Sequence, residues 1–225
     1  MSVFAISDLH LSFGNNKPMD IFGHNWENHT EKIKKDWEEK VMENDLVLLP
    51  GDFSWAMHLE ETIQDFYFIN NLPGKKLLLK GNHDYWWTTL ASMRKFLNEN
   101  NFKNIYFIYN NSFLFEDYII CGTRGWGTSE GPENEKIVNR EKIRLELSIE
   151  DGIKKFGKDM HKIVCMHYPP MEIFRKTINR YYVETVIYGH LHGTAQKEAI
   201  EGNIDGVNYK LVSCDYTDFK LIKIV

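Results

Sequence analysis

The chain has 225 residues, which suits one α/β domain, and we expect residues 1–225 to form a single domain. A net charge of −5 argues against a protein that coats nucleic acid, although it does not exclude a locally positive pocket. No apolar stretch approaches the roughly 20 residues that span a bilayer, and no secretory signal is visible, so a cytoplasmic protein without membrane association is expected. The cysteines Cys121, Cys165 and Cys214 lie in or beside apolar runs, which predicts reduced, buried thiols.

The first half of the chain alternates between predicted strands and predicted helices. Short apolar runs predict strands at residues 2–7, 46–49 and 77–79. Apolar residues at helical spacing predict helices at residues 26–43, 58–72 and 87–98. The run at 46–49 is continuously apolar and ends at Pro50-Gly51, which is typical of a buried parallel strand.

The second half begins with three aromatic and β-branched runs, at 105–109, 113–115 and 118–121, which predict a meander of strands. A polar loop at 129–135 precedes a long predicted helix at 134–156. Strands follow at 163–166 and 186–188, and residues 207–214 and 219–225 predict a closing hairpin. The order of these elements indicates an α/β fold with two mixed β-sheets and helices outside them.

Polar side chains follow directly after five of the predicted strands. They are Asp8, His10, Asp52, Asn82, His83, Asp84, His167, His190 and His192. Sites in α/β sheets form beyond the carboxyl ends of the strands, so these five loops are expected to converge. Imidazole, carboxylate and amide groups are ligands for metals such as Mn, Fe, Ni and Zn. A lone Asp-x-His or Gly-Asp pair is common by chance, but the joint occurrence of all blocks in this order indicates a metal site.

The spacing within the blocks supports a shared site. Alternate residues of an extended segment point the same way, so Asp8 and His10 can reach one cluster, as can His190 and His192. The glycines at 51, 81 and 189 suit sharp turns where the backbone leaves a strand. Without His83 and Asp84, seven candidate ligands remain. Seven ligands exceed what one tetrahedral site takes, which favours two metals that share a ligand.

These blocks resemble the calcineurin-like metallophosphoesterases over nearly the whole chain, from Asp8 to His192. The resemblance implies a four-layer fold in which two mixed β-sheets pack as a sandwich flanked by helices. It implies two divalent or trivalent ions (Mn, Fe, Zn or Ni) with Asp52 as the shared ligand. The first ion would be held by Asp8, His10, Asp52 and His192, and the second by Asp52, Asn82, His167 and His190.

The resemblance also implies a function. It predicts a phosphoesterase that cleaves a phosphomonoester or phosphodiester by in-line attack of a metal-bridging hydroxide, with His83 as the general acid. The expected substrate is a small phosphorylated molecule such as a nucleotide, and Asn82 and Arg124 are the residues expected to contact it. Two alternatives remain open: a non-catalytic scaffold on the same fold, and a nuclease, against which the acidic balance weighs.

The chain departs from the Ser/Thr protein phosphatase branch of that family, which has Gly-Asp-x-x-Asp-Arg-Gly. Here Trp55 and Ala56 replace the second Asp and the Arg, and Asp84 stands where that branch has Glu. Asp84 is therefore a candidate to orient His83. Arg124 is either the replacement for the missing arginine or an ordinary surface residue. The aromatic residues beside the motifs, such as Trp55, either wall a substrate pocket or pack the loops.

Overall fold

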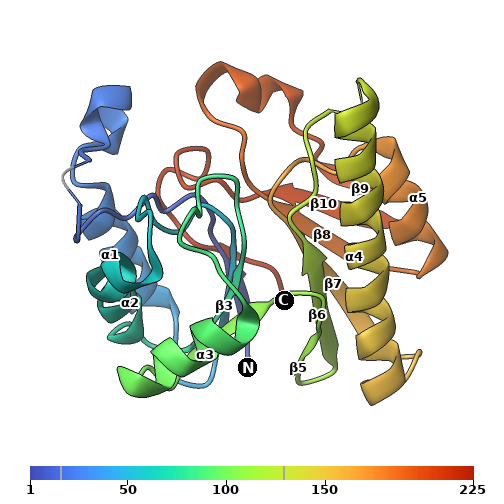
Figure 1. Cartoon of the computed structure of the whole chain (residues 1–225), viewed down its shortest axis with the longest axis horizontal. Coiled ribbons are helices and arrows are strands. Elements are labelled where there is room, and N and C mark those ends of the chain that lie inside the picture. The colour runs from blue at the N-terminus through green and yellow to red at the C-terminus, as the bar shows by residue number, and fades with distance from the viewer. Residues whose placement is uncertain (16, 129) are drawn as a thin grey trace.

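The computed structural model describes residues 1–15, 17–128 and 130–225. Its strands form two sheets that face each other, and its helices lie on the two outer faces (Figure 1). The strands are β1 (Val3–Ala5), β2 (Leu46–Pro50), β3 (Lys75–Leu79), β4 (Ile105–Ile108), β5 (Phe113–Phe115), β6 (Tyr118–Thr123), β7 (His161–Met166), β8 (Thr185–Tyr188), β9 (Gly202–Ile204), β10 (Val207–Leu211) and β11 (Ile222–Lys223). The α-helices are α1 (His29–Lys40), α2 (Ile63–Asn70), α3 (Leu90–Glu99), α4 (Pro132–Phe156) and α5 (Glu172–Arg180).

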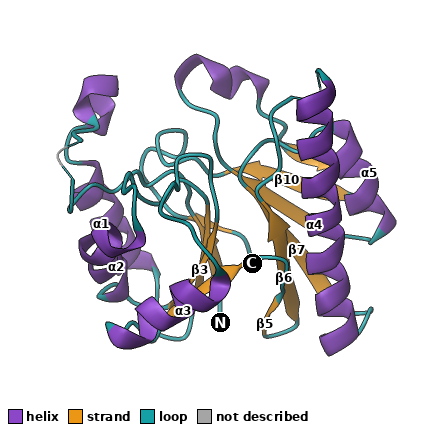
Figure 2. Ribbon diagram, viewed as in Figure 1, coloured by secondary structure: helices purple, strands orange, loops and turns teal. Residues whose placement is uncertain are grey.

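The two sheets are mixed, as predicted. The five-stranded sheet has the order β11-β1-β2-β3-β4, in which β1 to β4 are parallel and β11 is antiparallel to β1. The six-stranded sheet has the order β5-β6-β7-β8-β10-β9, with parallel β6, β7, β8 and β10 between two antiparallel edge strands. Helices α1 to α3 cover the first sheet, and α4 and α5 cover the second (Figure 2). The predicted α/β sandwich of four layers is confirmed.

Three apolar clusters hold the four layers together. One lies between the sheets and includes Val3, Leu48 and Ile163, each almost fully buried. The second joins α1 to α3 to the first sheet, and the third joins α4 and α5 to the second sheet. Strands buried on both faces are continuous apolar runs because each face needs apolar side chains. The three cysteines are buried and free, as predicted.

Local capping residues set several helix boundaries. The helix predicted from residue 87 begins at Leu90, because the Thr89 side chain accepts the backbone N–H of Ser92 at 3.2 Å. Helix α4 begins at Pro132 and is followed by Gly157, a common pairing of helix start and stop residues. Residue 129, where the predicted polar loop begins, lies outside the described residues. Among the described residues, no helix combines the length and apolar character that a membrane crossing requires.

Two predicted strand pairings are wrong. The closing hairpin does not form, because β10 pairs with β8 and β9 in the six-stranded sheet, whereas β11 pairs with β1 in the other sheet. The predicted meander is also divided, since β4 pairs with β3 while β5 and β6 form a hairpin in the second sheet. Apolar alternation identifies a strand but leaves its partner open, and packing between distant segments decides the partner.

Candidate metal centre

The loops after β1 and β2 run side by side at the carboxyl ends of the strands. The backbone N–H of Asp8 donates to the Gly51 carbonyl at 3.0 Å, and that of His10 donates to the Asp52 carbonyl at 3.0 Å. Asp8, His10 and Asp52 have φ values of 59°, 48° and 51°, and His190 has 73°. The prediction of an extended Asp8-x-His10 segment is therefore wrong. Left-handed backbone at non-glycine residues is uncommon and concentrates at functional sites.

Glycine permits the close approach of these loops. A Cβ atom at Gly81 would overlap the Asp52 carboxylate and its backbone nitrogen. A Cβ atom at Gly51, where φ is 97°, would overlap the His167 ring. The prediction that glycine permits a sharp turn therefore applies to Gly51, which has a positive φ. At Gly81, glycine is needed because the Asp52 side chain leaves no room for a Cβ atom.

The loop after β3 in the same sheet and the loops after β7 and β8 in the facing sheet complete the cluster. The Asn82 Oδ1 lies 2.6 Å from His167 Nε2 and 2.9 Å from His190 Nδ1. His167 is fully buried, and its Nδ1 lies 3.2 Å from the Pro50 carbonyl. The backbone N–H of His190 donates to both carboxylate oxygens of Asp8, at 3.2 and 3.1 Å. The two sheets are thus joined through the candidate ligands themselves.

All seven predicted ligands are brought to one place. His10 Nε2 lies 3.9 Å and His167 Nε2 lies 3.5 Å from Asp52 Oδ2. His192 Nε2 lies 3.4 Å from Asp8 Oδ1. Donor atoms within 4.8 Å of one another define two groups: Asp8, His10 and His192, and Asp8, Asp52 and His167. Such spacing suits cations placed between the side chains.

Burial and crowding shift the proton affinities of these groups. Burial and the nearby Asp8 charge raise the pKa of Asp52 to about 9. Burial alone would lower the pKa of His192, but its hydrogen bond to Asp215 and the negative charges of Asp8 and Asp215 raise it to about 10. Burial lowers the pKa of His167 to about 3. The site therefore buries two carboxylate groups among imidazoles that differ widely in proton affinity. A bound cation would compensate the negative charge of the carboxylates.

The residues present fit the metals that the sequence implies. Asp8 and Asp52 are at most 1% exposed, and neither faces a lysine or arginine within 4 Å among the described residues. His10 Nδ1 and His192 Nε2 are buried without a hydrogen-bond partner in the described part of the chain. Buried polar atoms are rarely left unpaired in proteins. The donor set of carboxylate, amide and imidazole suits transition metals.

Asp215 is a site residue that the sequence analysis missed. Its Oδ1 accepts a hydrogen bond from His192 Nδ1 at 2.7 Å, and its Oδ2 accepts one from Gln196 Nε2 at 2.9 Å. A carboxylate of this kind fixes the tautomer and the orientation of a metal-binding histidine. Asp215 follows a predicted strand, which is a weak local signal, but its role depends on the contact with His192 that only the fold creates.

Asp84 lies at the centre of a hydrogen-bond network under the site. Its carboxylate accepts backbone N–H groups of Asp52, Phe53 and Gly81 at 3.0, 3.0 and 2.7 Å, and the Trp86 indole N–H at 3.0 Å. These contacts tie the Asp52 loop to the Asn82 loop. The hydrogen-bond partners of the Asp84 carboxylate are thus groups of the loops that carry the candidate ligands Asp52 and Asn82, whereas the sequence analysis considered Asp84 a candidate to orient His83.

His83 faces an aromatic cavity beside the candidate ligands. Its backbone N–H donates to Asp52 Oδ1 at 2.8 Å, and its ring centroid lies 4.6 Å from that of Trp55. The cavity measures about 610 Å³ and is lined by His83, Trp55, Trp26 and His192, among others. Trp55 also stacks on His10, with centroids 4.7 Å apart and planes inclined by 18°.

The two interpretations of the aromatic residues apply to different side chains. Trp55 lines the cavity, as the functional interpretation expects, and Trp26, which the sequence analysis placed in a predicted helix, lines it as well. Trp86 and Trp87 are buried in the core of the first sheet, as the packing interpretation expects.

Backbone hydrogen bonds hold Arg124 beside the candidate metal ligands. Its carbonyl accepts the N–H groups of His167 and Tyr168 at 3.1 and 2.9 Å. Its guanidinium lies 4.9 Å from the Trp126 ring centroid and 3.9 Å from the Glu141 carboxylate, and its side chain is 19% exposed. Arg124 is therefore a packed arginine rather than an ordinary surface residue.

Comparisons with known proteins agree with this fold. A family model described as calcineurin-like phosphoesterase matches residues 1–194. No curated protein matches the chain. Since the matched region is most of the chain, the protein belongs to the calcineurin-like phosphoesterase family, whose chemistry is metal-dependent hydrolysis.

Several solved structures share the fold at low sequence identity. The phosphopantetheinyl hydrolase of Mycobacterium tuberculosis is 14% identical with a TM-score of 0.56, over 100% of this chain and 95% of that chain. Protein TT1561 of Thermus thermophilus is 13% identical with a TM-score of 0.59, over 99% and 97% of the two chains. A protein of unknown function from Aquifex aeolicus is 16% identical with a TM-score of 0.51, over 99% and 95%. These likenesses concern the fold alone.

Proposed function

We propose that this member of the calcineurin-like phosphoesterase family hydrolyses a small phosphomonoester or phosphodiester with two metal ions. One observation carries the proposal: two buried carboxylates, Asp8 and Asp52, face imidazole nitrogens at 3.4 to 4.0 Å. One ion would be held by Asp8, His10, Asp52 and His192. The other would be held by Asp52, Asn82, His167 and His190.

The metal pair would supply the positive charge that activates water and neutralises the phosphate oxygens. The remaining tasks belong to the protein. Asp215 orients His192, and Asp84 holds the Asp52 and Asn82 loops at a constant separation. Such support matters because small misplacements of reacting groups reduce rates strongly.

His83 is the proposed proton donor to the leaving oxygen. It is half-buried at the rim of the aromatic cavity, with its backbone anchored to Asp52. An imidazole can carry and release a proton near neutral pH, and positioned acid catalysis is worth about 10²–10⁴-fold. A leaving group with a flat organic part would lie in the cavity between Trp26 and Trp55, which supports a small-molecule substrate over a protein substrate.

A substrate and metal panel tests the activity. Purified protein, stripped with a chelator, is reloaded with Mn, Fe, Zn, Ni or Mg and assayed with p-nitrophenyl phosphate and bis-p-nitrophenyl phosphate. Turnover that depends on the added metal is expected, and the preferred ester separates a monoesterase from a diesterase. If no ester is hydrolysed with any metal, the scaffold alternative is favoured.

A single substitution separates catalysis from metal binding. We expect His83→Ala to lower kcat by about 10²–10⁴-fold while the metal content stays at the wild-type level. Asp52→Asn is expected to lower the metal content itself. His161→Ala is the matched control, because His161 begins β7 at the end opposite to His167 and does not line the cavity. A His83→Ala protein with wild-type kcat would contradict the assigned role.

A further inference from the structure

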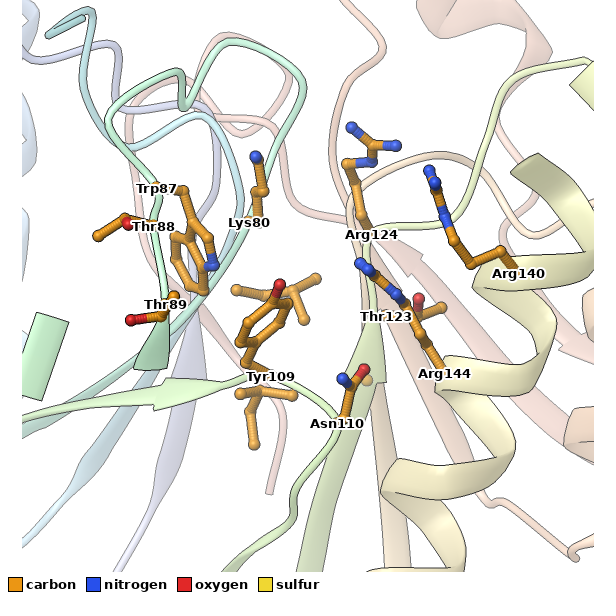
Figure 3. Close-up of a pocket in the computed structure, with 13 residues that line it drawn as sticks. Lys80, Trp87, Thr88, Thr89, Tyr109, Asn110, Thr123, Arg124, Arg140 and Arg144 are labelled. Atoms are coloured by element: carbon orange, nitrogen blue, oxygen red, sulfur yellow. The ribbon is translucent and has the colours of Figure 1, made fainter. Parts of the chain in front are cut away.

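A second pocket lies beside the candidate metal centre, between the two sheets and helix α4 (Figure 3). It measures about 370 Å³. We call it the cationic pocket and define it by Lys80, Trp87, Arg124, Arg140 and Arg144. Lys80 and Trp87 follow β3, Arg124 follows β6, and Arg140 and Arg144 project from α4 (Figure 3). Segments far apart in the sequence therefore supply its charges.

The cationic pocket has an excess of positive charge. Lys80 and the three arginines line it, and none of its described lining residues is acidic. Two carboxylates act on these cations: Glu141 is fully buried and lies 3.9, 3.7 and 3.4 Å from Arg124, Arg140 and Arg144, and the charge of Asp84 acts on Lys80. Two carboxylates balance two of the four cations, so the pocket keeps an excess of positive charge and favours an anion that carries more than one charge.

A buried hydrogen-bond donor also points to a ligand. Trp87 is 7% exposed, and its indole nitrogen has no hydrogen-bond partner in the described part of the chain. Figure 3 shows this nitrogen turned toward the interior of the pocket. An unpaired buried donor is costly, and an anion with several acceptor oxygens would satisfy it. Guanidinium groups match the oxygens of phosphate in two-pronged geometry.

The cationic pocket adjoins the metal centre through residues that do not line the aromatic cavity. Lys80 lies two residues before Asn82, and the Arg124 carbonyl holds the N–H of His167. The aromatic cavity instead touches His10 and His192. A substrate at the metal centre could therefore extend toward four cations in one direction and toward aromatic walls in the other.

We propose that the cationic pocket binds a second phosphate group of the substrate, so that the preferred substrates carry a phosphate besides the ester that is hydrolysed. This inference rests on the proposed function. A phosphate is favoured over a carboxylate because its charge approaches −2 and it offers more acceptor oxygens. A small molecule is favoured over a nucleic-acid strand because the cations surround one pocket and the chain carries a net charge of −5.

A matched pair of chromogenic esters tests the proposal. Thymidine 5′-(p-nitrophenyl phosphate) and the same compound with a 3′-phosphate differ only in the second phosphate. We expect the 3′-phosphate to raise kcat/KM about tenfold or more, the fold-change of one charge-assisted hydrogen bond. Arg140→Gln and Arg144→Gln should each reduce this preference, and the double variant should abolish it.

Controls guard against a general effect of charge or stability. Lys136→Gln removes a positive charge from an exposed position of the same helix and should keep the preference. Arg140→Gln alone is informative because that side chain is 56% exposed, so its loss should not prevent folding. The preference is the ratio of kcat/KM with the 3′-phosphate to kcat/KM without it. A ratio near one in the wild type, or an unchanged ratio in the double variant, overturns the proposal.

Further arms separate this inference from the proposed function and from other anion sources. If bis-p-nitrophenyl phosphate is hydrolysed but the 3′-phosphate has no effect, the proposed function stands and the inference fails. If inorganic phosphate changes bis-p-nitrophenyl phosphate turnover only when Arg140 and Arg144 are present, the pocket binds an effector and the substrate assignment is overturned. Better cleavage of a single-stranded oligonucleotide than of the bisphosphate, with a steep salt dependence, overturns the small-molecule assignment.

A binding measurement does not depend on turnover. In zinc-loaded, ¹⁵N-labelled protein the Trp87 indole resonance, assigned with Trp87→Phe, should move when inorganic phosphate is added. The double variant should lose this response. If no ester is hydrolysed yet the response is seen, the proposed function fails and the pocket stands as an anion site. A Trp87 resonance that ignores phosphate overturns the site.

Discussion

Removal of the Asp215 carboxylate should weaken metal binding without removing a metal ligand. Asp215 accepts the Nδ1–H of His192 at 2.7 Å and also holds Gln196 at 2.9 Å. A hydrogen bond to a charged group is worth about 1.5–3 kcal/mol. The His192 side chain is 32% exposed and that of Asp215 is 5% exposed, so the lower end applies. About 1.5 kcal/mol corresponds to about a tenfold loss of affinity for Asp215→Asn.

Asp215→Ala should cost more, toward about a hundredfold, because it also frees the His192 ring to rotate. The assay is a competition titration with a chromophoric chelator, followed by turnover at saturating metal. Excess metal should restore most of the turnover, since Asp215 positions a ligand and does not contact substrate. Asp218→Asn is the control, because that carboxylate is 81% exposed and pairs with Lys220. An unchanged affinity in Asp215→Ala would refute the assigned role.

Three further predictions concern the support of the site and of the fold. Gly81→Ala should sharply reduce the metal content, because the new Cβ overlaps the Asp52 carboxylate; metal analysis of purified protein checks this, and wild-type content would contradict it. Asp84→Asn should destabilise the protein by about 3 kcal/mol in urea unfolding, because an amide NH₂ would replace an oxygen that accepts backbone N–H groups. Lys76 is fully buried, and burial lowers its pKa from 10.5 to about 8, so the unfolded chain binds an extra proton between these values. Stability should therefore rise with pH across that window by up to about 3 kcal/mol, and Lys76→Met should remove the rise in urea titrations at several pH values; a slope that persists in the variant would contradict this account.

The candidate ligands could be predicted because their signal is local. Asp52, Asn82 and His167 each stand within three residues of the end of a continuous apolar strand, and a parallel strand delivers the polar residues that follow it to the carboxyl edge of its sheet. The residue types then indicate metal chemistry. To make this inference it is enough to know where each strand ends. The order of the strands in the sheet is not needed.

Other features depended on partners that the local pattern does not specify. The pairing of β10 and β11 was predicted wrongly because alternation in a strand does not name its partner. Asp215 was missed because its importance comes from His192, which precedes it by 23 residues. The left-handed backbone of Asp8 and His10 results from hydrogen bonds to the neighbouring loop, so a period-2 argument could not anticipate it.

The sequence by itself determined the layered fold and the chemistry of the ligand set, because hydrophobic periodicity and residue type are properties of short segments. Only the tertiary structure decided which side chains share a cavity. A net charge of −5 conceals four cations around one pocket, since Lys80 and Arg124 leave different sheets and Arg140 and Arg144 approach from a helix. Electrostatic potential depends on distance through space, and sequence separation carries little information about that distance.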